Sequence, residues 1–232
     1  EGAIFNGEKI VSKGKLKESK LLKIFNKGIY PARDTKSNLA DLEAQLAAAS
    51  SGKNSIKKIV DKYTLPIINF YMKEVKINAE DSVKKILLKL KNGKYETLMD
   101  NGSKIRLKIT INKKQKNAVF DFTGSSSQVT NNFNAPKAVT KSAILYDGCL
   151  NPIKIIIPNN SILNPKFPAA VVAGNVETSQ TIVDTINCAL KVQAACYGTM
   201  SNFTFGNKNF GYYETICGGE GASKDHNGTD AV

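Results

Sequence analysis

The first third of the chain is patterned for long helices. Apolar residues step by three and four positions between Leu39 and Tyr63, which predicts one amphipathic helix with Asp34 as its N-cap. Gly52 lowers the helix propensity in the middle of this stretch, so two helices joined at a kink are an alternative. A shorter amphipathic helix is expected before them, over residues 18–25.

A second long helix is expected immediately afterwards. Its apolar stripe runs from Ile68 to Leu90, Pro66 suits its first turn, and Asn92-Gly93 ends it. Because only a very short link separates the two long helices, we expect them to pack against each other in antiparallel orientation.

Beyond Gly93 the hydrophobic period becomes two, which is typical of strands. Strands are expected over residues 94–99, 104–112 and 117–124, a helix after Pro136, a buried strand over 152–158, and two short strands beyond residue 196. The predicted fold class is therefore α+β, with a long antiparallel helix pair followed by a mixed or antiparallel sheet with helices. We divide the chain into a basic helical region, 1–92, and an α+β region, 93–232, with one continuous domain as the alternative.

The stretch AVVAGNVETSQTIVDTINCAL, residues 170–190, places polar residues between two apolar runs. The first run is expected to be a buried strand, and a helix is expected from Glu177, with Asn175 or Thr178 as its cap. Spacing of seven residues puts Glu177 and Asp184 on one helix face, about 10 Å apart along the axis. The same face carries three further polar residues, Gln180, Thr181 and Asn187.

This polar face fits either a ligand site or a capped helix with a solvent-exposed polar surface. The residues alone do not favour one interpretation over the other. No lysine lies between Lys166 and Lys191 in a lysine-rich chain, which favours a site at the helix N-terminus. We expect the two acids to face a polar cavity, near Asn175 and Gln180, rather than open solvent. The candidate catalytic residues are Glu177 and Asp184, and the candidate substrate-binding residues are Asn175, Thr178, Gln180, Thr199 and Asn202.

The sequence lacks motifs for phosphate binding, histidine-based catalysis and metal binding. The chain has neither GxxxxGK[ST] nor GxGxxG, so nucleotide phosphates would have to be held elsewhere. The single histidine, His226, lies in a polar turn and is not expected to act as a base. The four cysteines lack metal-ligand spacing, so we expect no metal site and free thiols in a reducing cytoplasm.

The net charge of +13 is concentrated in residues 1–117, which carry 26 basic and 12 acidic residues. A polyanion-binding surface is one interpretation of this half. However, only Arg33 and Arg106 are arginines, and most lysines flank apolar helical stripes as they do on solvated helix faces. We therefore do not expect nucleic acid as a partner. No apolar run approaches the length of a membrane span, so no membrane contact is expected either.

Several blocks together resemble the hydantoinase B/oxoprolinase family. They are FDFTGSSSQV, NFNAPKAVTKSAILY, the long block GCLNPIKIIIPNNSILNPKFPAAVVAGNVETSQTIVD, GTMSNFTFG and YYETICGGEGA, and DLEAQLAAA near residue 45 is similar to a helical motif of the family. The likeness runs in order over almost the whole chain, and AGNVETSQ is its most specific part.

The resemblance implies a subunit of an ATP-dependent cyclic-amide hydrolase that opens a hydantoin or 5-oxoproline-like ring. It implies a hydantoinase A-type partner that binds ATP, a small cyclic amide as substrate and a hetero-oligomer. It allows a divalent metal whose ligands lie outside this chain. Related ATP-dependent ketone carboxylases, of the acetone carboxylase type, and a non-catalytic assembly segment are the alternatives.

The chain also departs from the family pattern. No part of it matches the family's N-terminal metal motif, and it stops before a later His-containing strand, so we expect a C-terminal portion of a longer subunit. The joins Tyr146–Asp147 and Leu190–Lys191 are shorter than the pattern. We expect a break in the backbone at both, and less strongly near Asn101–Gly102.

Overall fold

The computed structural model describes residues 3–27, 31–144, 149–195, 201–207, 210–216, 218–219 and 221–229. The chain divides into two compact units, Glu1–Lys73 and Glu74–Val232. The boundary between the two units lies inside a long helix. It differs from the division at residue 92 that was based on sequence composition, and that division stays a prediction.

The first unit holds a two-stranded hairpin and helices. Strands β1 (Val11–Ser12) and β2 (Lys15–Leu16) pair antiparallel and lead into helix α1 (Glu18–Phe25), which buries Leu21 and Phe25. Helix α2 (Thr35–Tyr63) follows Asp34, whose carboxylate accepts hydrogen bonds from the backbone N–H of Ser37 at 3.0 Å and from its hydroxyl at 2.7 Å. The predicted N-cap is confirmed, and α2 continues without interruption through Gly52, so the two-helix alternative is wrong.

Helix α2 is followed by its C-cap residue Thr64, whose φ of 68° turns the chain before helix α3 (Leu65–Lys89) begins. Pro66 lies in the first turn of α3, as predicted. The expected antiparallel packing of the two helices stays a prediction, because α2 and the start of α3 belong to one unit and the rest of α3 belongs to the other. The buried residues of α3 are Val83 and Leu87, near its far end.

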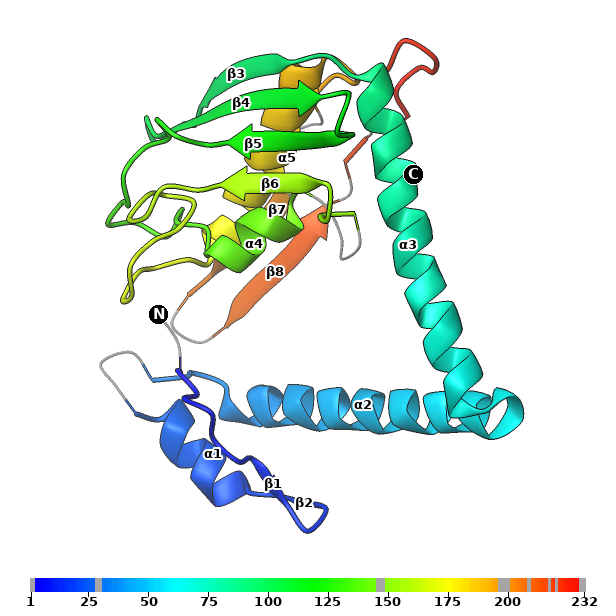
Figure 1. The fold of residues 1–232 in the computed structure, drawn as a ribbon. Coiled ribbons are helices and arrows are strands. Elements are labelled where there is room, and N and C mark those ends of the chain that lie inside the picture. The colour runs from blue at the N-terminus through cyan, green and yellow to red at the C-terminus, as the bar shows by residue number, and fades with distance from the viewer. Residues whose placement is uncertain are drawn as a thin grey trace. The chain divides into compact units, whose positions relative to one another are not determined.

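The second unit is built on a four-stranded mixed sheet (Figure 1). Its strands are β3 (Gly93–Leu98), β4 (Lys104–Asn112), β5 (Asn117–Asp121) and β6 (Ile153–Ile156), in that spatial order. The first three pair antiparallel, and β5 and β6 pair parallel. The predicted α+β class is confirmed.

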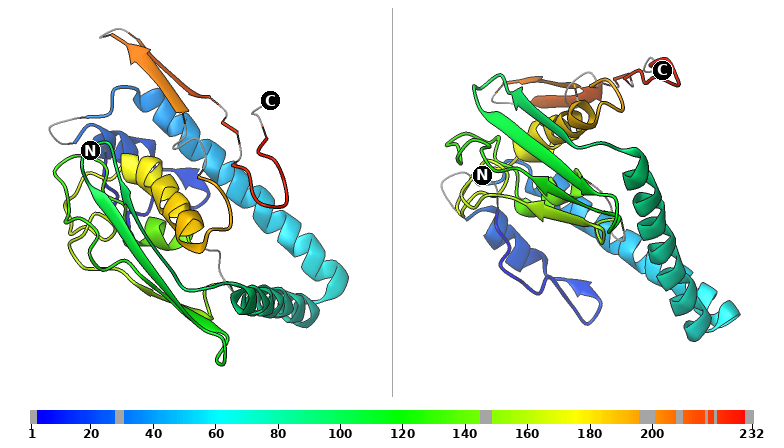
Figure 2. Two further views of the ribbon diagram at one scale, coloured as in Figure 1. Left: turned by 90° about the horizontal axis from the view of Figure 1, so that it is seen from above. Right: turned by 45° about the horizontal axis from the view of Figure 1, so that its top comes forward.

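Helix α5 (Glu177–Leu190) packs on one face of this sheet, which Figure 2 shows from two further directions. Strand β4 alternates, so Ile105, Leu107 and Ile109 face the core while the intervening side chains are exposed. The first residue of β3 must be glycine because a Cβ on Gly93 would lie 1.9 Å from the carbonyl oxygen of Ala189. The strand therefore lies directly against the last turn of α5.

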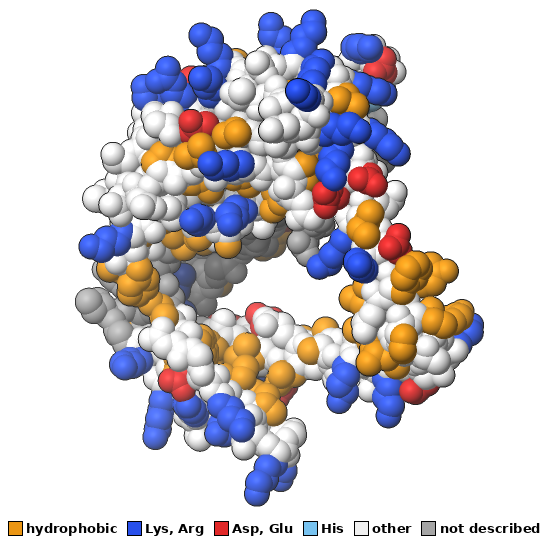
Figure 3. Space-filling model, in the orientation of Figure 1, with side chains coloured by type: hydrophobic (Ala, Val, Ile, Leu, Met, Phe, Trp, Pro, Cys, Tyr) orange, Lys and Arg blue, Asp and Glu red, His pale blue; other side chains and the backbone are white. Residues whose placement is uncertain are grey.

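The outer face of the sheet is charged. Lys104, Arg106 and Lys108 alternate with the buried residues of β4 and are exposed, and Figure 3 shows Lys and Arg side chains standing on this face. This arrangement agrees with the interpretation of the lysines as a solvated face. None of the described helices combines the length and the hydropathy that crossing a bilayer requires.

The connections hold the remaining short elements. Helix α4 (Lys137–Ser142) follows Pro136, and strands β7 (Ser201–Gly206) and β8 (Gly211–Ile216) form an antiparallel hairpin. The expected strand over 170–173 is wrong, because a 3₁₀ turn, η1 (Ala173–Asn175), leads into α5 instead.

The expected break at Leu190–Lys191 is also wrong. Helix α5 runs to Leu190, and the backbone N–H of the left-handed residue Lys191 bonds to the carbonyl of Asn187. The turn at Asn101–Gly102 is closed by a 2.9 Å bond from the Gly102 N–H to the Met99 carbonyl, so it is not broken either. The join at Tyr146–Asp147 lies outside the described residues.

Candidate functional site

A buried asparagine organises the loop in front of α5. Asn134 is fully buried, and its side-chain oxygen accepts a 2.9 Å hydrogen bond from the N–H of Val129. Its side-chain amide donates to the carbonyls of Val129, Asn131 and Ala170, at 2.8, 3.0 and 3.0 Å. Because every polar atom of this buried group is paired, it ties the Ser- and Asn-rich loop to the segment that enters the helix.

The entry to α5 depends on a glycine. A Cβ on Gly174 would lie 1.9 Å from the carbonyl oxygen of Asn134 and 2.8 Å from the Cα of Ala135. The N–H of Gly174 also donates to the Asn132 carbonyl at 3.1 Å. The helix can start this close to the loop because no side chain stands at position 174.

Buried threonines then fasten α5 to its neighbours. The hydroxyl of Thr178 donates to the carbonyl of Phe133 at 2.6 Å, and the hydroxyl of Thr185 donates to the carbonyl of Thr181 at 2.6 Å. The hydroxyls of Thr185 and Thr97 lie 2.8 Å apart. Since the only proton of the Thr185 hydroxyl goes to Thr181, Thr97 is the donor in that pair. Helix α5 is thereby linked to strand β3.

A cavity of about 390 Å³ lies between this helix and the end of the β3–β4 hairpin. Helix α5 contributes four residues at spacings of four, three and four, which places them on one helix face. The cavity is lined by Tyr95, Thr97, Leu98, Met99, Asp100, Phe133, Glu177, Thr181, Asp184, Cys188 and Ala195.

The two candidate catalytic acids lie together in this lining. Glu177 and Asp184 are half-buried, and the Asp184 carboxylate accepts a hydrogen bond from the side-chain amide of Gln180 at 3.2 Å. Both acids line this cavity, but Asn175 and Gln180, near which a polar cavity was expected, do not. The catalytic role of the two acids stays a prediction.

The other candidates are placed differently. Gln180 bonds Asp184 but does not line the cavity, and Asn175 is exposed with its side-chain amide 3.3 Å from the Val171 carbonyl. Thr178 is fully buried, so its position gives it a packing role. The expected side-chain cap by Asn175 or Thr178 is wrong, because Val176 occupies the N-cap position without a side-chain hydrogen bond.

Two further candidates cannot be placed in the cavity. Thr199 lies outside the described residues, and Asn202 belongs to strand β7, where the structure describes its backbone alone.

Sequence reasoning missed the residues that come from the sheet. The register pairs Tyr95 with Leu107 and Thr97 with Ile105, so both side chains stand on the face that α5 covers. Asp100 follows in the hairpin turn, about eighty positions away from the helix in the chain. Cys188 could have been found, because it lies four residues after Asp184 on the predicted polar face.

The cavity is acidic in charge and mixed in polarity. Its lining holds the carboxylates of Glu177, Asp184 and Asp100, and no Lys, Arg or His among the described residues. Carboxylates in such a setting can accept and return protons. Within the described ranges, no group of three His, Cys, Asp or Glu side chains is arranged to hold a metal ion.

The same lining does not fit ATP. A triphosphate would meet three carboxylates and no cation among the described lining residues, and phosphate binding relies on cations, glycine-rich loops or helix N–H groups.

Comparisons with known proteins point to one family. The family model described as hydantoinase B/oxoprolinase matches residues 1–232. The chain is 39% identical to 5-oxoprolinase 1 of Arabidopsis thaliana and 41% identical to 5-oxoprolinase of Dictyostelium discoideum, each over 100% of this chain. It spans about a fifth of the length of these curated relatives, 21% and 20%. The Arabidopsis alignment runs over 272 positions against 232 residues here, so that relative has additional residues inside the matched region.

A solved structure shares the fold. It is the ATP-dependent caprolactamase from Pseudomonas jessenii, with a TM-score of 0.71 and 18% identity, and the match covers 96% of this chain and 43% of that one. The match over the full length of the chain, together with two relatives near 40% identity, shows that the chain belongs to the hydantoinase B/oxoprolinase family.

Proposed function

We propose that this chain forms the ring-handling part of an ATP-dependent hydrolase that opens small cyclic amides of the hydantoin or 5-oxoproline class. The observation that carries the proposal is the presence of Glu177 and Asp184 in one cavity of about 390 Å³. The family and the relatives named 5-oxoprolinase support the substrate class.

Glu177 and Asp184 would move the protons of ring opening. One carboxylate accepts a proton from a water molecule while the water oxygen attacks the amide carbonyl carbon. The carbon–nitrogen bond of the ring then breaks, and the carboxylic acid formed in the first step returns its proton to the ring nitrogen. Tyr95 and Phe133 supply apolar surface against which a ring can lie.

ATP would be handled outside this cavity, because the lining does not fit a triphosphate. We assign that role to a hydantoinase A-type protein region, which is either a separate chain of a hetero-oligomer or a segment of the same longer polypeptide. A relative from Pseudomonas sp. that is named as a D-/L-hydantoinase component is 27% identical over 92% of this chain, while the 5-oxoprolinase relatives are much longer than the chain. We place the assembled enzyme in the cytoplasm.

Substrate-dependent ATP hydrolysis tests the proposal. The native protein is assembled with its hydantoinase A-type region, and phosphate release is measured with hydantoin, 5-oxoproline and caprolactam, and with acetone plus bicarbonate. Phosphate release that depends on a cyclic amide, together with the ring-opened product, is expected. Phosphate release that depends on the ketone and bicarbonate would instead identify a carboxylase. If none of these compounds stimulates phosphate release, the chain would be a non-catalytic assembly segment.

A further inference from the structure

The threonine hydroxyls of the cavity lining have already used their protons inside the protein. Thr97 of β3 and Thr181 of α5 both line the cavity and are half-buried. The Thr181 hydroxyl donates to the carbonyl of Glu177 at 2.8 Å. A hydroxyl has one proton and two lone pairs, so a hydroxyl that already donates can only accept a further hydrogen bond. Toward the cavity, Thr181 therefore offers lone pairs alone.

Thr97 is in the same state because of its buried neighbour Thr185. The Thr185 hydroxyl donates to the carbonyl of Thr181 at 2.6 Å, which uses its only proton. The Thr97 hydroxyl, 2.8 Å from that of Thr185, is consequently the donor of the pair. Thr185 is fully buried, which keeps this bond away from water. Thr97 and Thr181 thus reach the cavity, one from a strand and one from a helix, as hydrogen-bond acceptors.

The carboxylates complete a lining that accepts hydrogen bonds. Glu177 lies four positions before Thr181 and Asp184 three positions after it, so the three side chains form one row on the helix. Asp100 adds a third carboxylate from the hairpin turn. An ionised carboxylate accepts hydrogen bonds and donates none. Acceptors therefore come to the cavity from both the helix and the sheet.

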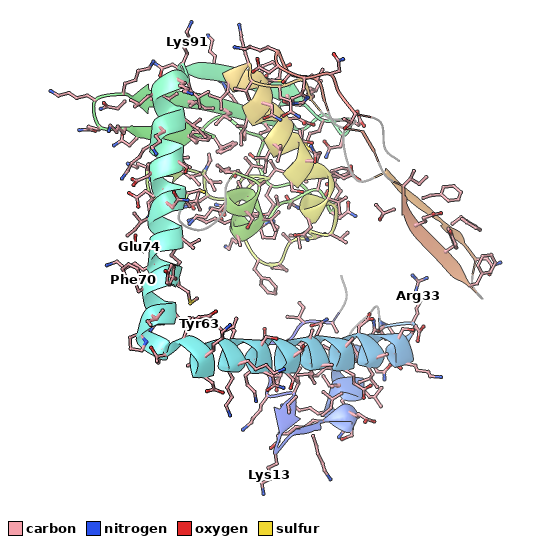
Figure 4. The ribbon with its side chains drawn as sticks, turned by 90° about the vertical axis from the view of Figure 1, so that its right-hand side faces the viewer. Lys13, Arg33, Tyr63, Phe70, Glu74 and Lys91 are labelled. Carbon is pink, nitrogen blue, oxygen red and sulfur yellow. The ribbon has the colours of Figure 1, made fainter. Side chains whose placement is uncertain are left out.

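Few side-chain donors stand opposite these acceptors. Among the described lining residues, the side chains that can still donate are Tyr95, through its phenol, and Cys188, whose thiol is a weak donor. The described lining contains no Lys, Arg or His. Lys91, which precedes β3, is exposed, and Figure 4 shows it pointing outward from the unit. A ligand that brings its own donor would therefore complement this lining.

A cyclic amide can bring that donor in one orientation. Its ring carries a carbonyl oxygen, which accepts hydrogen bonds, and an N–H, which donates one. An acceptor that a bound ligand shields from water needs a donor from that ligand, because an unsatisfied polar group costs free energy. The ring N–H matches Thr97, Thr181 and the carboxylates, whereas the carbonyl oxygen would meet their lone pairs. The lining therefore favours entry of the ring with its N–H edge toward α5.

We propose that the cavity selects cyclic amides by their ring N–H, and that Thr181 is a residue that sets this selectivity. The inference rests on the proposed function and adds the chemical group that the cavity recognises. The N–H edge lies along Glu177, Thr181 and Asp184, which puts the ring nitrogen beside the carboxylates that return a proton to it. A ring whose nitrogen carries an alkyl group is rejected. A carboxylate on the ring, as in 5-oxoproline, points away from the three acids, because like charges repel.

Paired ligands test the selectivity without turnover. The full native protein is titrated with hydantoin, 5-oxoproline and caprolactam, and with the N-methylated form of each, with and without a non-hydrolysable ATP analogue. Ligand-observed NMR gives the dissociation constants. We expect each ring that binds to do so at least about tenfold more tightly than its N-methylated form, because a site built around a hydrogen bond rejects a ligand that lacks the matching group.

Substitutions at Thr181 separate the lost hydrogen bond from the added bulk of the methyl group. Thr181→Val removes the acceptor and keeps the shape of the side chain, so the preference for the N–H form should fall at least about threefold. Thr181→Ser keeps the hydroxyl and should keep the preference. Thr110→Val, the same change on the exposed face of β4, is the control and should leave every dissociation constant unchanged. Circular dichroism checks that each variant is folded.

The ratio of the two dissociation constants distinguishes the outcomes. If Thr181→Val weakens the binding of N–H and N-methylated rings equally, Thr181 has a structural role and its part in selectivity is overturned. If N-methylated rings bind the native protein as tightly as N–H rings, the selectivity itself is overturned and the proposed function stands. If no cyclic amide of either form binds, the proposed function fails and the inference fails with it.

Discussion

At the scale of single residues, the two acids of the cavity are held in different ways. Glu177 lies in the first turn of α5, where the partial positive charge of the helix N-terminus favours a carboxylate. Asp184 lies two turns further and accepts a hydrogen bond from Gln180 in the same helix. The neighbouring hydroxyls of Thr178 and Thr185 each donate a hydrogen bond to a backbone carbonyl that helps to position the helix. This division of roles between carboxylates and threonines leads to two predictions.

Glu177→Gln should lower the turnover of the assembled enzyme at least about tenfold, because the amide keeps the size of the side chain and cannot accept a proton as a base. Steady-state rates and circular dichroism are measured together. Glu18→Gln, the same substitution on the exposed surface of helix α1, serves as the control and should leave the rate unchanged. Unchanged turnover of Glu177→Gln would make this residue a helix-terminus acid without a catalytic role.

Thr97→Val should lower the free energy of unfolding by roughly 0.5–1.5 kcal/mol, because it removes the hydrogen bond that links β3 to Thr185. Urea titration measures the difference. Thr110→Val, on the exposed face of β4, is the matched control and should have a smaller effect. Equal values for the two variants would show that the Thr97–Thr185 bond contributes nothing to stability.

At the scale of elements, the site depends on how closely α5 approaches its neighbours. Gly174 lets the helix start against the loop that Asn134 organises, and Gly93 lets β3 reach the last turn of the same helix. The two ends of α5 are therefore each set by a contact that admits no side chain. Helix α3 is attached at its far end, where the side-chain amide of Asn151 donates to the Glu80 carboxylate at 2.7 Å.

Gly174→Ala should destabilise the protein by roughly 1–3 kcal/mol, because the new methyl group overlaps the backbone of Asn134 and that backbone must shift. Gly52→Ala is the matched control with the opposite sign. Nothing lies within 4 Å of a Cβ at position 52, so alanine should stabilise α2 by about 0.8–1.0 kcal/mol through helix propensity. Both are measured by urea titration followed by circular dichroism. If Gly174→Ala leaves the free energy of unfolding unchanged, the loop that contains Asn134 can shift at little energetic cost.

The attachment of α3 should depend on pH. The Lys84 ammonium, 2.5 Å from the Glu80 carboxylate, and the Asn151 amide hold the pKa of Glu80 below its ordinary value. A carboxylate whose pKa is lowered by folding stabilises the native state above its ordinary pKa, and this contribution is lost as the pH falls through the folded value. Glu80→Gln should therefore reduce stability at pH 7 and make no difference at about pH 2, below both pKa values.

Urea titrations at the two pH values measure this dependence. Glu74→Gln, the same substitution at an exposed position of α3, is the control and should show no such change between the two pH values. An effect of Glu80→Gln that is equal at both pH values would contradict a charge-dependent attachment.

At the scale of the whole molecule, the basic charge is spread rather than focused. The lysines of residues 1–117 are spread over helices, turns and the outer face of the sheet, and Arg33 and Arg106 are the only arginines of the chain. Nucleic-acid recognition favours arginine clusters on one face. The charge distribution is better suited to a solvated surface.

Binding to duplex DNA should consequently be weak and purely electrostatic. We expect it to fall steeply between about 50 and 200 mM salt and to be no tighter than roughly micromolar near 150 mM. Fluorescence anisotropy with a labelled duplex measures this. Binding that stays tight at the higher salt would revive the interpretation of the basic half as a polyanion-binding surface.

Much of the fold could be predicted from local patterns. Helical spacing between Leu39 and Tyr63 and the Asp34 cap correspond to α2, and period-two alternation corresponds to β4 and its neighbours. These features can be predicted because the formation of a helix or strand depends mainly on residues a few positions apart in the sequence. The same spacing placed Glu177 and Asp184 on one face of α5, which the structure confirms.

The tertiary structure alone decided what surrounds those acids and which apolar faces are buried. Tyr95, Thr97 and Asp100 join the cavity through pairing of β3 with β4 and packing of that sheet on α5, contacts that link residues far apart in the chain. The antiparallel pairing of the two long helices stays a prediction for a related reason, since an apolar stripe shows that a helix has a face to bury and does not show its partner. Local pattern therefore determined the elements and the two acids, while long-range packing decided the rest of the cavity.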